Sequence, residues 1–182
     1  MKIGVPKEIK NNEYRVGLTP ESVSEIIKNN HEVFIQKNAG TEIGFSNEQY
    51  EKVGATIIET AEELYKNSEL IVKVKEPVPE EFGYLNEKHT VFAYLHLAGD
   101  PKTGLELAST GITGIALETV TADDGSMPLL SPMSSIAGQL SIVVGSYHLL
   151  KPNKGMGTLI GALDDVERRV VTVIGAGVAG TM

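Results

Sequence analysis

The chain contains no cysteine and no tryptophan among its 182 residues. The lack of cysteine excludes disulfide bonds, thiolate nucleophiles and cysteine-ligated metals, which suits a reducing compartment, and we assign no metal ligands. Long apolar runs are missing as well. None approaches the roughly 20 residues of a membrane span, and the first apolar run is too short for the core of a signal peptide. We therefore expect a cytoplasmic protein that has no membrane partner.

Clusters of basic residues are also absent. The 16 Lys and Arg residues are scattered among 24 Asp and Glu residues, and the formal net charge is −8. A chain of this kind is a poor partner for nucleic acid, so we expect small-molecule chemistry. The hydrophobic fraction of 41% and the charged fraction of 22% are typical of a folded globular protein. The length permits one domain, or one domain and the start of another, and we favour the second arrangement.

Short β-rich runs alternate with helix-like segments in the first part of the chain. Thr19 is a suitable N-cap, Pro20 fits the first helical position, and Glu21 complements the helix dipole. Two capping-box patterns, 46–49 and 60–63, mark further helix starts. Strands are expected at 2–5, 32–36, 55–59, 69–75, 90–97 and 112–118. This alternation predicts an α/β fold, a Rossmann-like parallel sheet with flanking helices on both faces.

The composition changes in the last third of the chain. Residues 133–150 are apolar almost all round, which predicts a long buried helix that connects two domains. Residues 169–174 are rich in β-branched side chains and read as a strand. We therefore divide the chain into a substrate domain, 1–130, and a segment, 131–182, that holds the connecting helix and the first helix and strand of a second Rossmann domain.

A G-x-G-x-x-G pattern follows the last predicted strand. Alone it is a weak signal, because three glycines can form only a turn, but the preceding apolar strand supports a dinucleotide fingerprint. Gly175 permits the tight turn, Gly177 lets the backbone approach the pyrophosphate, and Gly180 allows close helix packing. The acidic residue that binds the ribose is expected about 20 residues later, past Met182. We expect a chain that stops inside the cofactor-binding unit, and the choice between NAD and NADP stays open.

Two lysines alternate with valines in the predicted strand 69–75. Lys73 and Lys75 would therefore point to one face of a strand that otherwise looks buried. A buried lysine is costly unless it is paired or used, whereas a lysine on an edge strand is merely solvated. Both interpretations stay open. We favour Lys75 as the functional residue, because it lies at the end of the strand, where open α/β sheets bind their ligands.

Two more candidates fall at the same predicted edge of the sheet. Arg15 lies in the loop after the first strand, where a guanidinium can clamp a carboxylate, although an exposed loop arginine needs no function. His96 follows an apolar strand; a structural histidine is the commoner case, but the strand end favours an acid/base group. The other histidines lack this context. Together with Lys75, these residues suit a small 2-keto or 2-amino acid as substrate.

Five separated segments resemble the NAD-dependent alanine dehydrogenases, in the same order and over essentially all 182 residues. The segments are 1–8, 11–16, 72–77, 95–98 and 130–134. The resemblance implies reversible oxidative deamination of L-alanine by NAD, giving pyruvate and ammonium. It also implies a homo-hexamer, and a substrate domain completed by a returning C-terminal segment.

The resemblance assigns roles by matching motif. Arg15 and Lys75 would bind the substrate, and His96 would be the acid/base catalyst. Ser134 would contact the cofactor pyrophosphate, beside the three fingerprint glycines. The family uses a further catalytic aspartate that lies in the cofactor domain, outside these residues. We therefore expect residues 1–182 to be inactive by themselves.

Three alternatives remain open. The N-terminal part of a transhydrogenase α subunit is similar in its first strand and glycine fingerprint, but it has no need for a pair such as Lys75 and His96. A relative of the saccharopine or lysine-ketoglutarate reductases would take a larger substrate. The chain is also compatible with a non-enzymatic oligomerisation module, if the apolar helix 133–150 mediates contacts between subunits.

Overall fold

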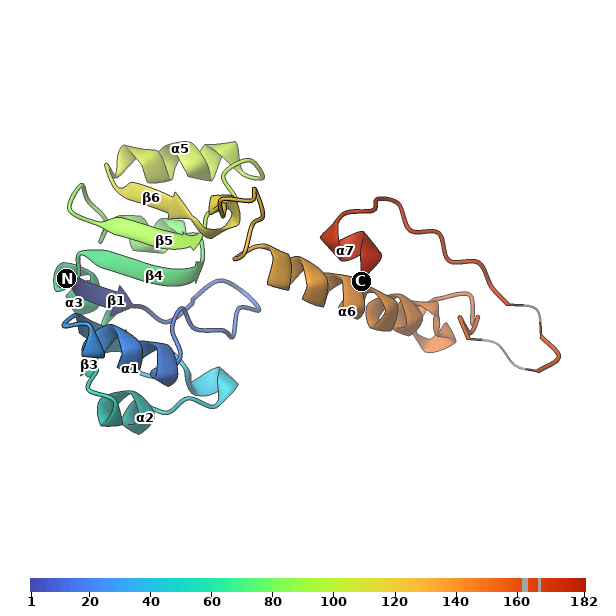
Figure 1. The fold of residues 1–182 in the computed structure, drawn as a ribbon, viewed down its shortest axis with the longest axis horizontal. Coiled ribbons are helices and arrows are strands. Elements are labelled where there is room, and N and C mark those ends of the chain that lie inside the picture. Colours follow the sequence, from blue (N-terminus) through green and yellow to red (C-terminus); the bar gives the residue numbers. More distant parts are fainter. Residues whose placement is uncertain (162–163, 167) are drawn as a thin grey trace. The chain divides into compact units, whose positions relative to one another are not determined.

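The structure is a computed structural model that describes residues 1–161, 164–166 and 168–182. It divides into two compact units, Met1–Thr119 and Val120–Met182, which we describe separately. The first unit is built on a six-stranded sheet with the order β3-β2-β1-β4-β5-β6 (Figure 1). All neighbouring strands are parallel. The predicted Rossmann-like α/β fold is therefore confirmed.

All six predicted strands of the first unit are present. They are β1 (Lys2–Val5), β2 (Glu32–Gln36), β3 (Thr56–Ile58), β4 (Leu70–Lys75), β5 (Thr90–Tyr94) and β6 (Thr113–Ala116). The last two are shorter than predicted, because the chain leaves the sheet after Tyr94 and enters a 3-10 turn after Ala116. The helices are α1 (Pro20–Lys28), α2 (Asn47–Lys52), α3 (Ala61–Lys66), α4 (Pro79–Phe82) and α5 (Pro101–Ser109), with 3-10 turns η1 (Thr41–Ile43) and η2 (Leu117–Thr119).

Side-chain hydrogen bonds begin three of these helices where the sequence predicts. The hydroxyl of Thr19 accepts a hydrogen bond from Ser22 N at 3.2 Å at the start of α1. Ser46 N donates to Gln49 Oε1 at 2.7 Å before α2, and the hydroxyl of Thr60 caps α3. Such caps satisfy backbone N–H groups that have no partner inside the helix.

The sheet lies between two apolar clusters, one on each face. Alternate residues of a strand point to opposite faces, so Val33 and Ile35 join one cluster while Phe34 packs against the other. The first cluster includes residues of α1 and α2, and the second includes residues of α3 and α5. Helices therefore cover both faces. This arrangement leaves the carboxyl ends of the strands as the place where loops can form a site.

The strand order reverses between β1 and β4. The chain builds β1, β2 and β3 outward in one direction, and then crosses to place β4 on the other side of β1. At such a switch point the loops after the two central strands diverge, which leaves a crevice at their carboxyl ends. The loop after β1 carries Arg15, and β4 ends at Lys75.

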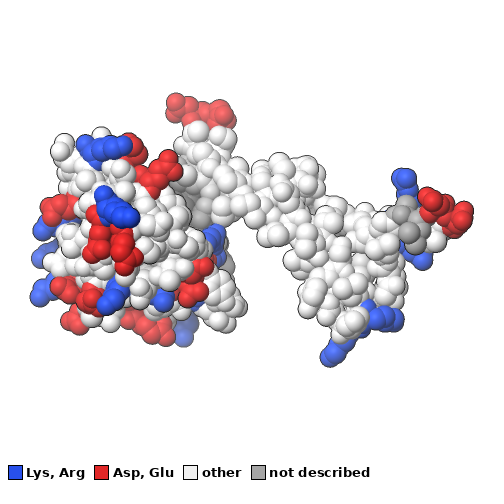
Figure 2. All heavy atoms as spheres, turned by 90° about the horizontal axis from the view of Figure 1, so that it is seen from below, with Lys and Arg blue, Asp and Glu red and all other residues white. Residues whose placement is uncertain are grey.

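The second unit contains α6 (Ser131–Leu149), the 3-10 turn η3 (Lys151–Asn153) and the short helix α7 (Val178–Thr181). The long predicted helix is present, but the prediction that it is buried is wrong. Val143 is 64% exposed and Tyr147 is 57% exposed, and Gly138 is the single buried residue of the helix. Within its unit α6 packs mainly on α7, and most of its apolar side chains are exposed. The helix contains no Lys, Arg, Asp or Glu, and the side of it that Figure 2 shows is uncoloured.

The predicted strand at 169–174 is also wrong. These residues form no strand, and Val170 and Ile174 are 92% and 98% exposed. A β-strand needs a neighbour to accept and donate its backbone hydrogen bonds. In the part of the chain that the structure describes, the only sheet belongs to the first unit. No helix among the described residues is long and apolar enough to cross a membrane.

Candidate functional site

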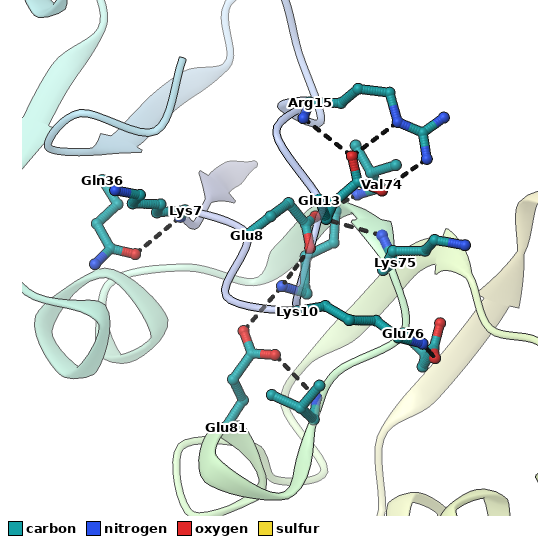
Figure 3. Close-up of polar contacts among 12 residues, drawn as sticks. Lys7, Glu8, Lys10, Glu13, Arg15, Gln36, Val74, Lys75, Glu76 and Glu81 are labelled. Carbon is teal, nitrogen blue, oxygen red and sulfur yellow. Dashed lines mark hydrogen bonds and ion pairs between the residues drawn. The ribbon is translucent and has the colours of Figure 1, made fainter. Parts of the chain in front are cut away.

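The structure brings together the three substrate-site candidates of the first unit at the carboxyl edge of the sheet. Arg15 lies in the loop after β1, Lys75 ends β4, and His96 follows β5, and these three strands are neighbours. The ammonium Nζ of Lys75 lies 3.2 Å from His96 Nε2. Arg15 pairs with Glu13 in the same loop (Figure 3), and the charge of Lys75 also acts on the Glu13 carboxyl.

Glu13 holds the guanidinium of Arg15 in a fork. Its Oε1 accepts hydrogen bonds from Arg15 Nε at 2.8 Å and from the backbone N at 3.0 Å, and its Oε2 accepts one from NH2 at 2.7 Å. Hydrogen bonding to Arg15 lowers the pKa of the Glu13 carboxyl, and the charge of Lys75 lowers it further. The same contacts raise the pKa of Arg15. The sequence analysis gave Glu13 no role, although it lies two residues before Arg15.

His96 has a backbone conformation that a non-glycine residue seldom adopts. Its φ is +49°, in the left-handed region, which costs about 1 to 2 kcal/mol for such a residue. Glu118, in η2, holds it there: its carboxylate accepts hydrogen bonds from the backbone N of His96 at 2.7 Å and of Leu95 at 3.2 Å. Sequence reasoning missed Glu118. Strain that is held in place by a second element is typical of functional residues.

The imidazole of His96 lies between two site residues. Its ring stacks on Tyr94, with centroids 6.2 Å apart and planes inclined by 19°. The ammonium of Lys75 is a hydrogen-bond donor, and a ring nitrogen of His96 can accept from it. An imidazole can also take up a proton from a reacting group or return one to it. Beside it lies an open hollow of about 430 Å³, lined by His96, Leu97, Ala98, Gly99, Ala116, Glu118 and Thr119.

The two lysines of β4 lie in different environments. Lys73 is 2% exposed, and its Nζ lies 2.9 Å from Glu81 and 3.2 Å from Glu8. Of the two interpretations left open for it, the buried and paired lysine is therefore correct, because β4 is a central strand. Lys75 escapes this burial, since the ladder with β5 shifts register between Val72 and Lys75.

The remaining histidines have local partners or lie outside this edge. His89 is buried; its Nδ1 accepts a hydrogen bond from Asn86 N at 3.1 Å, and its Nε2 lies 3.0 Å from the carbonyl of Tyr65. His31 lies beside the N-terminal amine, and His148 lies in α6 of the second unit. In the described ranges, no three His, Asp or Glu side chains gather closely enough to hold a metal ion.

The fingerprint glycines lie in the second unit, and the local geometry of two of them, Gly175 and Gly180, requires glycine. Gly175 has a φ of +108°, and a Cβ on Gly180 would lie 2.3 Å from the carbonyl oxygen of Gly175. A Cβ on Gly177 would meet no atom within 4 Å, so its backbone borders open space. These features fit a loop that a pyrophosphate can approach closely.

Ser134 lies in the first turn of α6, in the same unit as the glycines. One turn further along, Gly138 packs on α7, where a Cβ would lie 2.3 Å from the carbonyl oxygen of Ala179. Ser134 thus lies one turn before the residue of α6 that packs against the fingerprint segment.

Two family models match the chain. The model described as "Alanine dehydrogenase/PNT, N-terminal domain" matches residues 4–137, and the model described as "Alanine dehydrogenase/PNT, C-terminal domain" matches residues 141–182. The chain belongs to the alanine dehydrogenase/PNT family. The family resemblance inferred from the five sequence segments is therefore confirmed.

Similar proteins carry the alanine dehydrogenase name. The alanine dehydrogenase of Bacillus subtilis is 47% identical over 181 residues, which is 100% of this chain and 47% of that protein. The one of Mycolicibacterium smegmatis is 45% identical over 180 residues, which is 99% of this chain and 48% of that protein. The chain spans about half the length of the curated relatives that it matches.

Two solved structures of alanine dehydrogenase and transhydrogenase are similar to this chain. An L-alanine dehydrogenase is similar with a TM-score of 0.88 and 43% identity, over 100% of this chain and 50% of that one. A transhydrogenase from Sinorhizobium meliloti is similar with a TM-score of 0.71 and 27% identity, over 81% of this chain and 45% of that one. Both branches of the family therefore share this fold.

Proposed function

We propose that this chain provides the substrate site and the start of the cofactor site of an NAD-dependent alanine dehydrogenase. The enzyme interconverts L-alanine with pyruvate and ammonium. The observation that carries the proposal is the contact of 3.2 Å between Lys75 and His96, beside the Glu13–Arg15 fork. Two cations and an imidazole lie at the same sheet edge, which supports this proposal in a family whose alanine dehydrogenases are more than 40% identical to this chain.

The chemistry of each site residue supports a specific role in the proposed reaction. Arg15 and Lys75 bind the carboxylate and the neighbouring oxygen of the 2-keto acid, because both are hydrogen-bond donors with a positive charge. His96 holds or takes up the proton of the reacting oxygen. NAD, when bound, accepts the hydride of alanine. Ser134 and the fingerprint glycines would hold its pyrophosphate.

The transhydrogenase alternative is less well supported. A protein that only exchanges hydride between nicotinamides handles no carboxylic acid and needs no proton carrier beside a lysine. The Lys75–His96 contact favours amino-acid chemistry, and so does the identity of 43% to an L-alanine dehydrogenase structure against 27% to a transhydrogenase.

The remaining features of the proposal follow the family. We propose a substrate domain at 1–130, and a segment, 131–182, that begins the NAD-binding domain. The full-length protein would be a cytoplasmic homo-hexamer. Light scattering on the purified full-length gene product tests the hexamer.

Formation of NADH from L-alanine tests the proposed activity. We expect the full-length gene product to reduce NAD in the presence of alanine, and to oxidise NADH with pyruvate and ammonium. His96→Ala should lower kcat by at least ~100-fold, since it removes the acid/base group. Lys28→Ala, at an exposed lysine of α1, is the matched control and should not change the rate. Absence of alanine-dependent NADH formation by the wild type would disprove the proposal.

Residues 1–182 should give no turnover when they are assayed alone, because the second catalytic group and most of the NAD site lie outside them. Turnover above background by this fragment would contradict that expectation. If the fragment forms a defined oligomer while the full-length gene product has no activity on alanine, the non-enzymatic alternative is favoured instead.

A further inference from the structure

A buried carboxylate, Glu8, lies directly behind the proposed substrate-binding residues. It belongs to the loop that leaves β1 and continues to Arg15, and only 2% of its side chain is exposed. A carboxylate is costly to bury unless its oxygens are hydrogen-bonded and its charge is paired. The proposed chemistry gives Glu8 no part. The hydrogen-bond and ion-pair partners of Glu8 therefore indicate its role.

Both oxygens of Glu8 point to β4 (Figure 3). Oε1 accepts a hydrogen bond from the backbone N of Val74 at 2.6 Å, and a longer one from the backbone N of Lys75 at 3.4 Å. Oε2 accepts a hydrogen bond from the ammonium of Lys73 at 3.2 Å. One side chain from the β1 loop thus holds three consecutive residues at the end of β4.

The hydrogen bonds of Glu8 lie where the pairing of β4 with its neighbouring strands becomes irregular. The pairing of β1 with β4 reaches Gly4 and Ile71, so the last residues of β4 extend beyond it. On the other side, the ladder with β5 shifts register between Val72 and Lys75. Backbone N–H groups that the ladder does not use need another acceptor when they are buried. The carboxylate of Glu8 is that acceptor.

The carboxylate of Glu8 shares its one cation with a second buried carboxylate. Lys73 pairs with both Glu8 and Glu81, and the hydroxyl of Tyr65 donates to Glu81 at 2.7 Å. Burial raises the pKa of the Glu8 carboxyl, while the charge of Lys73 opposes this shift. A buried ionic group of this kind adds little stability over well-packed apolar residues. What Glu8 supplies, and an apolar side chain cannot, is a fixed link between two segments.

We propose that Glu8 is a positioning residue of the substrate site. It fixes the loop that carries Arg15 against the end of β4 that carries Lys75, and so sets the separation of the two cations that bind the substrate carboxylate. The inference rests on the proposed function and adds a residue that touches neither substrate nor cofactor. An ion pair between Lys10 and Glu76 joins the same two segments on the outside.

Steady-state kinetics of two matched variants test this role in the full-length gene product. Glu8→Leu and Glu81→Leu both remove a buried carboxylate from Lys73, but Glu81 lies in α4 and does not belong to the β1 loop. Glu8→Leu should raise KM for pyruvate roughly tenfold, with a smaller change in kcat, because the backbone N of Val74 loses its acceptor and misplaced binding groups weaken substrate positioning. Glu81→Leu should leave KM within about twofold of the wild type. Equal effects of the two variants on KM would overturn the proposal.

A second pair of variants keeps the test valid if either single variant fails to fold. Both carry Lys73→Met and Glu81→Gln, which remove the other buried charges, and they differ only in Glu8→Gln or Glu8→Leu. The amide oxygen of Gln can still accept a hydrogen bond from Val74 N, so the variant with Gln at position 8 should keep a KM near the wild-type value. The variant with Leu at position 8 should have a raised KM.

The outcomes separate the two proposals. If the Gln and Leu variants have the same KM, the positioning role of Glu8 is wrong, although the wild type remains an alanine dehydrogenase. If the wild type itself has no activity with alanine or pyruvate, the proposed function is wrong.

Discussion

In the candidate site, a protein carboxylate neutralises one of two cations. Glu13 pairs with Arg15, and the charge of Lys75 also acts on it. Two positive charges and one negative charge leave one positive charge among these three side chains. A small acid with a single carboxylate would neutralise it, whereas a neutral molecule would leave it unbalanced. This charge balance favours monoanionic acids such as alanine in its carboxylate form or pyruvate.

The Glu13–Arg15 fork predicts a pH-dependent contribution to stability. Glu13→Gln should lower the free energy of unfolding by about 1 kcal/mol near neutral pH, since a partly exposed arginine is screened by solvent. Arg15 lowers the pKa of the Glu13 carboxyl below its ordinary value of 4.5, so this stability is present above that pH and is lost as the pH falls through the lowered pKa.

Urea unfolding of wild type and Glu13→Gln at several pH values measures this contribution. The difference between the two proteins should shrink in acid. Glu42→Gln, at an exposed residue of η1, is the control and should give no difference at any pH. A difference that stays constant into acid would show that the effect of Glu13→Gln is not electrostatic.

The cationic and basic members of the site could be predicted from the sequence, whereas their acidic partners could not. Arg15, Lys75 and His96 stand out because each follows a strand or a strand end. Glu118 and Glu8 acquire their roles only when the fold brings them to partners 22 and 65 residues away. Such distances exceed any local pattern, and a loop carboxylate without a partner looks like any solvated acid.

Among the elements, the loop between β1 and α1 packs against β4 at one glycine. A Cβ on Gly17 would lie 2.5 Å from the carbonyl oxygen of Val72 and 3.3 Å from Lys73 N. These are backbone atoms of a central strand, which cannot rotate away as a side chain can. The absence of a side chain at Gly17 therefore allows the segment that carries Arg15, two residues earlier, to lie against β4.

Gly17→Ala should destabilise the protein and weaken substrate binding together. The overlap with Val72 should cost about 2 kcal/mol of unfolding free energy, as for other overpacked sites, and the displaced Arg15 should raise KM for pyruvate. Gly83→Ala is the control, because Gly83 has a φ of −64° and a Cβ there meets no atom within 4 Å.

Thermal unfolding and steady-state kinetics of both glycine variants measure the loss of stability and the change in KM. Gly83→Ala should change the unfolding free energy by less than about 0.5 kcal/mol. If Gly17→Ala is as stable and as active as Gly83→Ala, the close approach of this loop to β4 is not required.

Elements were predictable where local chemistry determines them. The start of α1 follows from Thr19 and Pro20, and the central strands follow from their apolar runs. The helix α5 was missed, although Asp100 caps it and Pro101 begins it, because Gly104 weakens its helical pattern. The strand expected at 169–174 failed for the opposite reason: its residues favour a strand, but a strand forms only beside another one.

At the scale of the whole molecule, the two units differ in how much apolar surface they bury. Every buried apolar side chain in the described part of the chain lies in the first unit, where two clusters cover the faces of the sheet. In α6 of the second unit, Ile136, Leu140, Val143 and Val144 are all at least half exposed. Burial of apolar surface is the main driving force of folding, so stability should concentrate in Met1–Thr119.

Limited proteolysis of residues 1–182 should therefore begin in the second unit. Trypsin is expected to cut first after Lys154, Arg168 or Arg169, which are exposed and lie outside the long helices, while the lysines of the first unit are protected by its cooperative fold. Thermolysin, which cuts at apolar residues, should also cleave the exposed second unit closer to the sheet and leave a product that ends within 120–149. Intact mass of the products identifies each cut. Early cleavage within 1–119 would instead mean that the sheet unit does not hold together as the more stable body.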